Sequence, residues 1–223
     1  MERTRAALIA AGQRLFSERP VDAVTVDDIV QAAEVGKGSF YNHFTDREAL
    51  YREIADEIRA RIELAVDRCN VEVEDPAQRM ARAVCTYFRF VLDDPERASV
   101  LVRINSGESS LSAPLNRGLV YDVSIGLKAG RFAVPTLEAG VLYVLGIAQM
   151  GLVRLVSETT ASFAVSLAQQ MCGLLLRGLG LPGPEAELLA AQASDEIVRE
   201  GAYAGTFQKR SRSSNDPTPT DSL

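Results

Sequence analysis

The chain has 223 residues, of which 47% are hydrophobic and 24% are charged, and its formal net charge is −6. This composition suits an ordinary globular protein with a sizeable core, and it excludes a polycation that binds nucleic acid over its whole surface. The three cysteines, Cys69, Cys85 and Cys172, form no Cys-x-x-Cys pair. No disulfide framework or zinc site is therefore predicted, and a reducing cytoplasm is the expected location.

Apolar residues recur at helical spacing along almost the whole chain, which predicts an all-α fold. The first helix starts as an amphipathic stretch, unlike a signal peptide, and ends before Pro20. Its apolar stripe consists of Ala7, Leu8, Ala11, Leu15 and Phe16. A second helix is predicted from Thr25, whose hydroxyl suits an N-cap, with Asp27 and Asp28 at the positive end of the helix dipole.

A turn at 34–36 leads into a short helix over 37–44, and Asp46 caps a long helix that is predicted to run to about Cys69. Two more helices are expected to begin at Asp75-Pro76 and at Asp94-Pro95, because proline is favoured at the first helical position. A loop rich in Ser and Gly is expected at 105–113. The remaining helices are predicted at 114–131, 136–157 and 160–177 and from Pro184 to about 202.

Two segments bear on the location of the chain. The most apolar stretch, 139–153, is bounded by Glu138 and Arg154 and is shorter than the ~20 residues that a membrane-spanning helix needs. We expect a buried helix of a soluble protein there and no association with a membrane. The polar segment 205–223 has few apolar residues, which predicts a disordered tail.

The segment EVGKGSFYNHF, residues 34–44, allows three interpretations. A phosphate-binding Walker loop needs glycine five positions before Gly36 and Ser or Thr after Lys37, but Gln31 and Gly38 stand there. A catalytic site would have to be built around His43, the only histidine, and no carboxylate or cysteine stands at a matching spacing. We therefore predict no enzyme, no catalytic residue, no cofactor and no metal.

The third interpretation is a helix-turn-helix, whose second helix enters the major groove of DNA. Gly36 is then the N-cap of that helix, and Val35 and Phe40 form a hydrophobic staple that fixes its entry angle. Phe44 packs inward with Phe40. Side chains that can donate and accept hydrogen bonds remain outside, which indicates a surface that reads DNA.

Residues 25–50, TVDDIVQAAEVGKGSFYNHFTDREAL, strongly resemble the DNA-binding region of the TetR (tetracycline-repressor-like) family of transcriptional regulators. The shared features are the Thr-capped helix, the Val-x-Lys-Gly-Ser-aromatic-Tyr core and the Asn-His-Phe ending. The resemblance implies an N-terminal three-helix helix-turn-helix domain over 1–47, with the motif at about 24–44. A larger C-terminal helical ligand-binding and dimerisation domain would follow over 48–204. DNA contacts are implied for Thr25, Lys37, Gly38, Ser39, Tyr41, Asn42, His43 and Arg47.

Two positions depart from the pattern of the family. The usual turn glycine is Glu34, which would strain a left-handed backbone and place a negative charge near DNA, and Gly36 is a weaker cap than the usual Ser or Thr. Residues 1–50 also contain six Arg or Lys against eight Asp or Glu, a balance of −2. These features support an alternative, a helical ligand-binding or dimerisation protein with weak or lost DNA binding.

The resemblance also implies a homodimer and an effector. A reader of a palindromic operator needs two heads, so the helices at 136–157 and 160–177 are expected to meet a second copy, although the same faces could pack in a monomer core. The implied interface residues are Leu145, Leu152, Leu167, Met171 and Leu174. Candidate contacts to a small apolar or amphipathic effector are Tyr87, Phe88, Arg103 and Tyr121. The expected function is that of a repressor that leaves double-stranded operator DNA when the effector binds.

Overall fold

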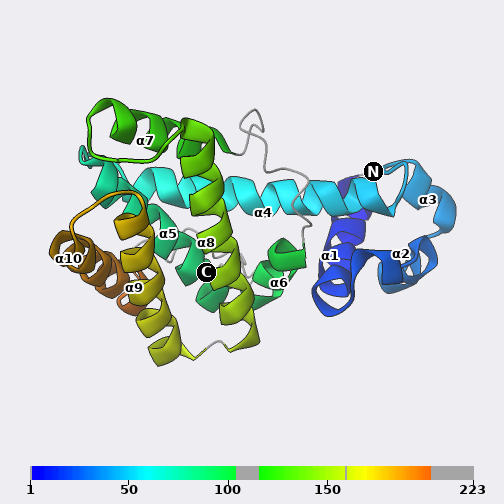
Figure 1. Cartoon of the computed structure of the whole chain (residues 1–223). Helices are drawn as coiled ribbons and strands as arrows, with labels where there is room; N and C mark the ends of the chain where they lie inside the picture. The colour runs from blue at the N-terminus through cyan, green and yellow to red at the C-terminus, as the bar shows by residue number, and fades with distance from the viewer. Residues whose placement is uncertain (1, 104–115, 159, 202–223) are drawn as a thin grey trace, which may run out of the picture.

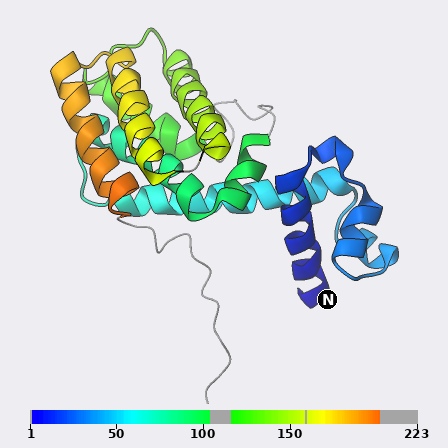
Figure 2. The same ribbon diagram turned by 90° about the horizontal axis from the view of Figure 1, so that it is seen from below.

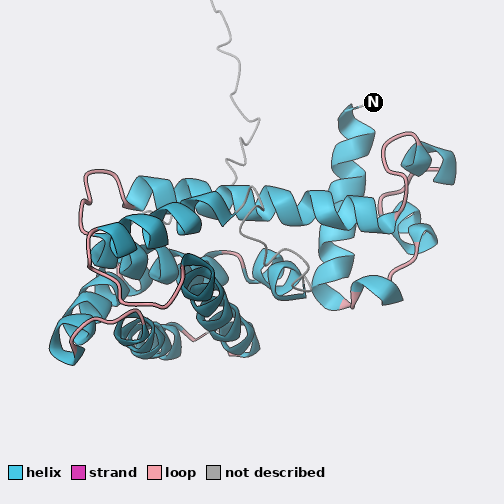
Figure 3. Cartoon of the chain, turned by 45° about the horizontal axis from the view of Figure 1, so that its top comes forward, coloured by secondary structure: helices cyan, strands magenta, loops and turns pink. Residues whose placement is uncertain are grey.

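The computed structural model describes residues 2–103, 116–158 and 160–201, and every regular element in these ranges is a helix (Figures 1 and 3). The first elements form a small head at one end of the molecule, and the later helices form a larger body at the other end (Figure 1). The expected all-α class is therefore confirmed, as is the division into an N-terminal helix-turn-helix part and a larger helical part.

The head consists of α1 (Glu2–Glu18), the 3-10 turn η1 (Val21–Ala23), α2 (Val26–Ala32) and α3 (Lys37–Tyr41). Its completely buried side chains include Leu8, Phe16, Ile29 and Phe40. The predicted cap sets the start of α2: Thr25 Oγ1 accepts a hydrogen bond from Asp28 N at 3.1 Å, and the Asp28 carboxylate accepts one from Thr25 N at 2.9 Å. This capping box pairs two backbone amides at the start of the helix.

The head and the body share α4 (Arg47–Cys69), a single helix of 23 residues that runs from one to the other (Figures 1 and 2). Asp46 caps it, as predicted, by accepting a hydrogen bond from Ala49 N at 2.6 Å. Near its start Leu50 and Ile54 lie against Gly12 of α1. Near its other end Val66 lines a cavity together with residues of the body. Because α4 is one continuous helix, a displacement of its end in the body also displaces its end in the head.

The body contains α5 (Pro76–Asp93), α6 (Pro95–Arg103), α7 (Arg117–Lys128), α8 (Leu137–Ser157), α9 (Ala161–Gly178), α10 (Gly183–Ala193) and the π-helical turn η3 (Ser194–Arg199). α5 is its central helix and packs against α4, α7, α8, α9 and α10. Asp75 caps α5 and Pro76 occupies its first position, as predicted. Met80, Phe88 and Phe90 of α5 are at most 1% exposed, so this helix is buried on more than one side.

The close approach of α8 to α5 depends on Gly151. A Cβ atom at this position would lie 2.3 Å from Cζ of Phe88, which is closer than non-bonded carbon atoms approach one another. A larger residue at 151 would therefore push the two helices apart and deform the cavity between them.

Several boundaries differ from those expected. The short helix predicted over 37–44 ends at Tyr41 and is followed by a turn, and the last helix, predicted to end near 202, ends at Ala193 and continues as η3. The described part of the helix predicted at 114–131 begins at Arg117. The expected loop at 105–113 and the expected tail at 205–223 lie outside the described residues.

The apolar stretch 139–153 lies within α8, and the expectation that it is buried is met only in part. Only 33% of the most apolar 18-residue window of α8 is buried in the protomer. By length and composition α8 could also cross a membrane, a test that core helices of soluble proteins pass as well. Its exposed apolar side is therefore a surface that needs an explanation.

Candidate nucleic-acid interface and ligand cavity

α3 turns one face into the head and leaves the other face open. Phe40 is completely buried, and the centroid of its ring lies 5.7 Å from that of Phe44. Tyr41 is 54% exposed and packs edge-on against Phe40. Six of the predicted DNA contacts lie along α3 and the turn after it, and all are exposed or half-buried: Lys37, Gly38, Ser39, Tyr41, Asn42 and His43. We call these six residues the reading surface.

Lys37 on the reading surface already has an anionic partner. Its Nζ lies 2.8 Å from Oδ1 of Asp27 on α2, and both side chains are open to solvent. The hydrogen bond to Asp27 raises the pKa of Lys37. An exposed ion pair of this kind is weak, because solvent screens both charges. A DNA phosphate can therefore replace Asp27 at low cost, but Asp27 reduces the positive potential that the head presents.

The other two predicted DNA contacts hold the head together. The Thr25 hydroxyl donates a hydrogen bond to the Asp28 carboxylate at 2.8 Å, in addition to its role as the cap of α2. Nη1 of Arg47 donates to the backbone oxygens of Asp22 and Val24, at 3.0 Å each. The Arg47 guanidinium thus ties the start of α4 to the segment before α2, and it fixes the position of α2 whether or not it also reaches a phosphate.

The turn between α2 and α3 contains the strained residue that the sequence suggested. Glu34 has a φ of 55°, in the left-handed region that favours glycine. Val35 N donates to Val30 O at 3.0 Å and Glu34 N donates to Gln31 O at 3.2 Å, which is the Schellman pattern that ends α2. The pattern requires a left-handed residue at 34, so the tight turn is formed at a cost in backbone strain.

Gly36 precedes α3 as expected, with extended backbone angles and no side-chain cap. A Cβ atom at this position would meet nothing within 4 Å. A serine would therefore fit and could supply the missing cap.

A cavity of about 70 Å³ lies in the body, among residues of α4, α5, α7 and α8. Its walls are mostly apolar and include Val66, Met80, Ala83, Val84, Leu119, Val144, Leu145 and Ala148. Its polar lining consists of Glu63, Tyr87, Asn116 and Asp122, together with the backbone of Gly118. An apolar space with a few polar groups at one part of its wall is typical of a small-molecule site.

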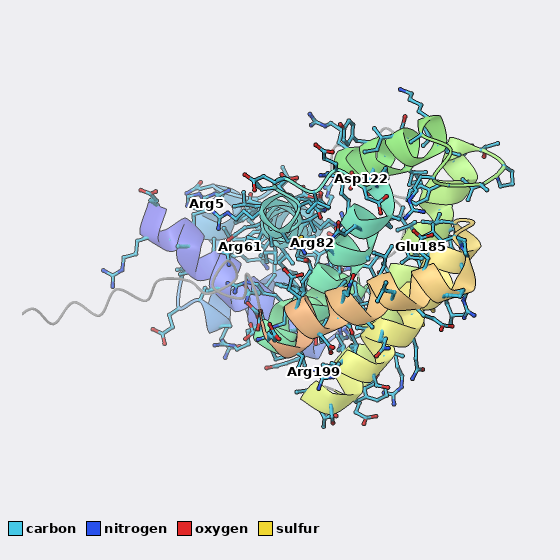
Figure 4. The ribbon with its side chains drawn as sticks, turned by 90° about the vertical axis from the view of Figure 1, so that its left-hand side faces the viewer. Arg5, Arg61, Arg82, Asp122, Glu185 and Arg199 are labelled. Atoms are coloured by element: carbon cyan, nitrogen blue, oxygen red, sulfur yellow. The ribbon has the colours of Figure 1, made fainter. Side chains whose placement is uncertain are left out.

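The two carboxyl groups in the wall have different partners. Glu63 Oε1 accepts a hydrogen bond from the Tyr87 hydroxyl at 2.7 Å. Asp122 points from α7 toward α5 and accepts one from Nε of Arg79, also at 2.7 Å (Figure 4). Burial raises the pKa of Glu63, of Asp122 and of Tyr87. Arg79 therefore neutralises Asp122, whereas a neutral hydroxyl faces Glu63.

Only one of the four predicted ligand contacts lines this cavity. Tyr87 does so, but Phe88 is completely buried in the core beside Gly151. Tyr121 is 58% exposed on α7, and Arg103 is exposed at the end of α6. The sequence could not place these four side chains relative to the cavity, because aromatic residues at helical spacing do not indicate which face of the helix they occupy. Their role as ligand contacts stays a prediction. Glu63 and Asp122 were missed, although each is a carboxylate beside apolar residues in a helix, which was the available signal.

The predicted interface residues divide in a similar way. Leu174 on α9 is 48% exposed, and Leu167 and Met171 are half-buried. Leu152 is only 2% exposed and belongs to the core of the protomer, while Leu145 lines the cavity. The exposed apolar residues of α8 are instead Leu142, Met150 and Val153, which are 44%, 58% and 37% exposed. They recur at the spacing of one helical face.

A second hollow, of about 370 Å³, lies where α1 of the head meets α4 and α6. Gln13 joins its walls: its Nε2 donates to Oε1 of Glu96 at 3.1 Å, and its Oε1 accepts from Nε of Arg97 at 3.0 Å. This polar joint connects the head to the start of α6. Among the residues that the structure describes, no group of three His, Cys, Asp or Glu side chains could hold a metal ion, and all three cysteines are buried free thiols.

Comparison with known families places both parts of the chain in one class of protein. Residues 8–54 match the family described as bacterial regulatory proteins, tetR family. Residues 75–192, more than half of the chain, match the family described as tetracyclin repressor-like, C-terminal domain. These families comprise regulators of transcription and not enzymes.

Individual relatives agree with the family matches. The HTH-type transcriptional repressor DhaR of Mycobacterium sp. (strain GP1) is 32% identical over 98 residues, which cover 44% of this chain and 48% of DhaR. The match to an HTH-type regulator of Haemophilus influenzae covers 53% of that protein, so the chain spans about half the length of these two relatives. The regulator YdgC of Bacillus subtilis is 25% identical over 79% of this chain and 92% of its own length.

Solved structures extend the likeness to the whole fold. RolR in complex with its ligand resorcinol has a TM-score of 0.61 and 27% identity, and the match covers 86% of this chain and 94% of RolR. A gamma-butyrolactone receptor, with a TM-score of 0.59 and 19% identity over 87% of this chain and 97% of its own, shares the fold.

Proposed function

Because the chain belongs to the tetR family of DNA-binding regulatory proteins, we propose that it is a cytoplasmic, homodimeric repressor that binds a palindromic operator and is released by a small effector. The observation that carries this proposal is the reading surface, a row of polar side chains presented by a helix whose other face is anchored by Phe40 and Phe44.

The operator contacts follow from the chemistry of the reading surface. Lys37 can exchange Asp27 for a phosphate, and the Tyr41 ring and hydroxyl stand free to pack against the DNA backbone. Asn42 and Ser39 can donate to and accept from base edges in the major groove. Thr25 and Arg47 support these contacts by fixing α2 and the start of α4.

A homodimer is supported by the exposed apolar face of α8, together with Leu174 on α9. Leu142, Met150 and Val153 would be covered by the same helices of a second copy. Two heads bind a palindrome only if the reading surfaces stand about 34–36 Å apart or at a multiple of that distance. The dimer therefore also sets the spacing of the half-sites.

Release by an effector is supported by the cavity between α4, α5, α7 and α8. The effector is expected to be small and apolar or amphipathic, and the resorcinol bound by RolR is a compound of this kind. A ligand that favours the conformation with wrongly spaced heads would lower operator affinity, and a coupling of about 1–3 kcal/mol corresponds to roughly 5–150-fold.

The reading surface is tested with Tyr41→Ala and the matched variant Tyr121→Ala, since the two tyrosines are 54% and 58% exposed. Binding to duplexes from the DNA that flanks the gene is measured by fluorescence anisotropy at fixed salt. We expect Tyr41→Ala to weaken operator binding by about 1–3 kcal/mol and Tyr121→Ala to leave it unchanged. Equal affinities for wild type and Tyr41→Ala would refute the assignment of the reading surface.

A second candidate function is a ligand-binding or dimerisation protein with weak or lost DNA binding. It is favoured by the Asp27 carboxylate on Lys37 and by the strained, acidic Glu34 beside the reading surface. The anisotropy experiment separates the two functions. Specific binding to a palindromic duplex supports the repressor, and binding that does not exceed that of a scrambled duplex supports the alternative.

A further inference from the structure

We propose that the cavity of the body selects an uncharged single-ring phenol, whose hydroxyl donates a hydrogen bond to the Glu63 carboxyl, and that it rejects carboxylates and phosphates. This inference rests on the proposed function in that it assigns the effector class to the same cavity. It does not depend on whether the protein binds DNA.

The first support is the hydrogen bonding of the two carboxyl oxygens of Glu63. Its Oε1 accepts the Tyr87 hydroxyl, and its Oε2 lies beside Gly118, where a Cβ atom would come within 3.1 Å. Within the described ranges of the chain, Oε2 accepts no hydrogen bond and no cation pairs with Glu63. Glu63 and Gly118 both line the cavity, so the second oxygen is available to a ligand there.

The second support is the charge of the polar side chains that line the cavity. Among the described residues that line the cavity there are two carboxyl groups, those of Glu63 and Asp122, and no lysine or arginine. Arg79 is already bound to Asp122. An anionic ligand would therefore place a third acidic group in a space whose described lining supplies no cation, and burial makes such a charge costly. This argues against an acidic effector in this cavity.

The third support is a phenol hydroxyl that the protein itself supplies. The Tyr87 hydroxyl lies 2.7 Å from Glu63, which is the geometry of a strong hydrogen bond from a neutral donor to a carboxyl oxygen. A ligand phenol can make the same bond to Oε2 while its ring packs on Val66, Met80 and Val144. A cavity of about 70 Å³ suits this occupant, since one water takes about 10–15 Å³ by the same measure.

The test measures ligand binding to the full chain without DNA, by isothermal titration calorimetry. The neutral probes are phenol, catechol and resorcinol. 1,3-Dimethoxybenzene has its donors blocked by methylation, and 3-hydroxybenzoate adds a negative charge. We expect at least one neutral phenol to bind, and both of the other compounds to bind at least about tenfold more weakly, because each loses a hydrogen bond or adds an unpaired charge. Failure of every neutral phenol to bind, or equal binding of 3-hydroxybenzoate, would overturn the proposal.

Two variants identify the residue responsible. Glu63→Gln should weaken the binding of phenol by about tenfold or more and at the same time strengthen the binding of 3-hydroxybenzoate. A loss of folding would weaken the binding of both ligands and so cannot produce these opposite changes. Gly118→Ala should also weaken the binding of phenol, because the added Cβ atom crowds Oε2 of Glu63 without changing any charge. The control is Glu187→Gln, which makes the same chemical change at an exposed site on α10 and should alter nothing.

The outcomes also separate this inference from the proposed function. An unchanged preference for phenol over 3-hydroxybenzoate in Glu63→Gln overturns the role of Glu63, whatever the DNA experiments show. If phenol binds as expected but leaves operator affinity unchanged, the selectivity of the cavity stands and release by the effector fails.

Discussion

At the scale of single residues, Glu34 and Glu72 hold a backbone conformation that is costly for any side chain. Their φ angles are 55° and 65°, and they are the two non-glycine residues with positive φ in the described ranges. Glu34 stands next to the reading surface, whereas Glu72 follows the end of α4 in the body. The pair therefore allows backbone strain to be separated from the effect of charge on DNA binding.

We predict that Glu34→Gly and Glu72→Gly each raise the free energy of unfolding by roughly 0.5–1 kcal/mol, because glycine relieves left-handed strain but gains freedom in the unfolded chain. Chemical denaturation measures this change. Only Glu34→Gly should also tighten DNA binding, since it alone removes a negative charge beside the reading surface. A loss of stability in Glu34→Gly would show that the side chain contributes more than the strain costs.

A second prediction at this scale concerns the Asp27–Lys37 pair. Asp27→Asn should tighten binding to non-specific duplex DNA by roughly 2–5-fold, because Lys37 no longer has to leave an anionic partner before it binds a phosphate. The control is Glu18→Gln, which removes one negative charge from the exposed end of α1 without affecting Lys37. Anisotropy titrations over a range of salt compare the two variants. An equal gain in both would mean that only the net charge of the head matters.

The sequence predicted residue roles well where a local pattern determines them. Thr25 as a cap, the left-handed position of Glu34 and the inward Phe40 depend on neighbours within a few positions, and the structure has each of them. Glu63 and Tyr87 are 24 positions apart, and only the packing of α4 on α5 brings them together. No local sequence pattern predicts this contact between α4 and α5, so the polar side chains of the cavity could not be predicted from the sequence.

At the scale of elements, α8 shows what the spacing of apolar residues can and cannot predict about a helix. The helix is apolar on most of its sides, so periodicity located it but could not say which side faces the protomer. Leu152 was predicted at the interface and is buried inside the protomer, whereas Met150, two positions earlier, is 58% exposed. Two residues apart on a helix is about 200°, which places these two side chains on opposite faces.

This difference determines which variant tests the dimer. We predict that Met150→Glu shifts the protein from dimer to monomer without unfolding it, because a charge buried between two copies costs on the order of 3 kcal/mol. Leu188→Glu is the matched control, since Leu188 on α10 is 57% exposed and lies off the α8 face. Light scattering after size exclusion measures the mass, and melting temperature reports folding. A dimer in both variants would locate the interface elsewhere.

At the scale of the whole molecule, the head and the body meet at α4 and at the polar joint of Gln13. α6 lies between α1 and α8, and Gln149 Nε2 on α8 donates to Val102 O on α6 at 3.2 Å. A chain of contacts therefore leads from the helices of the cavity through α6 to α1, beside the second hollow of about 370 Å³.

We predict that Gln13→Ala reduces the coupling between effector and operator while each still binds alone, because it removes the side-chain hydrogen bonds to Glu96 and Arg97. The measurement titrates the best-binding neutral phenol with and without operator, and the ratio of the two affinities should fall by roughly threefold or more relative to wild type. Gln169→Ala, at an exposed position of α9, is the control. An unchanged ratio would mean that the hydrogen bonds of Gln13 carry none of the coupling.

The unbroken length of α4 acts as a lever arm. Its 23 residues span about 34 Å, so a tilt of about 5° at the cavity end carries the far end through about 3 Å. In a symmetric pair of protomers the two excursions add when the arms swing apart. In the proposed dimer, the heads would then miss a half-site spacing of about 34–36 Å by several ångströms. The length of this helix would thus let the proposed single-ring effector displace a DNA-binding surface that lies about 34 Å from the cavity.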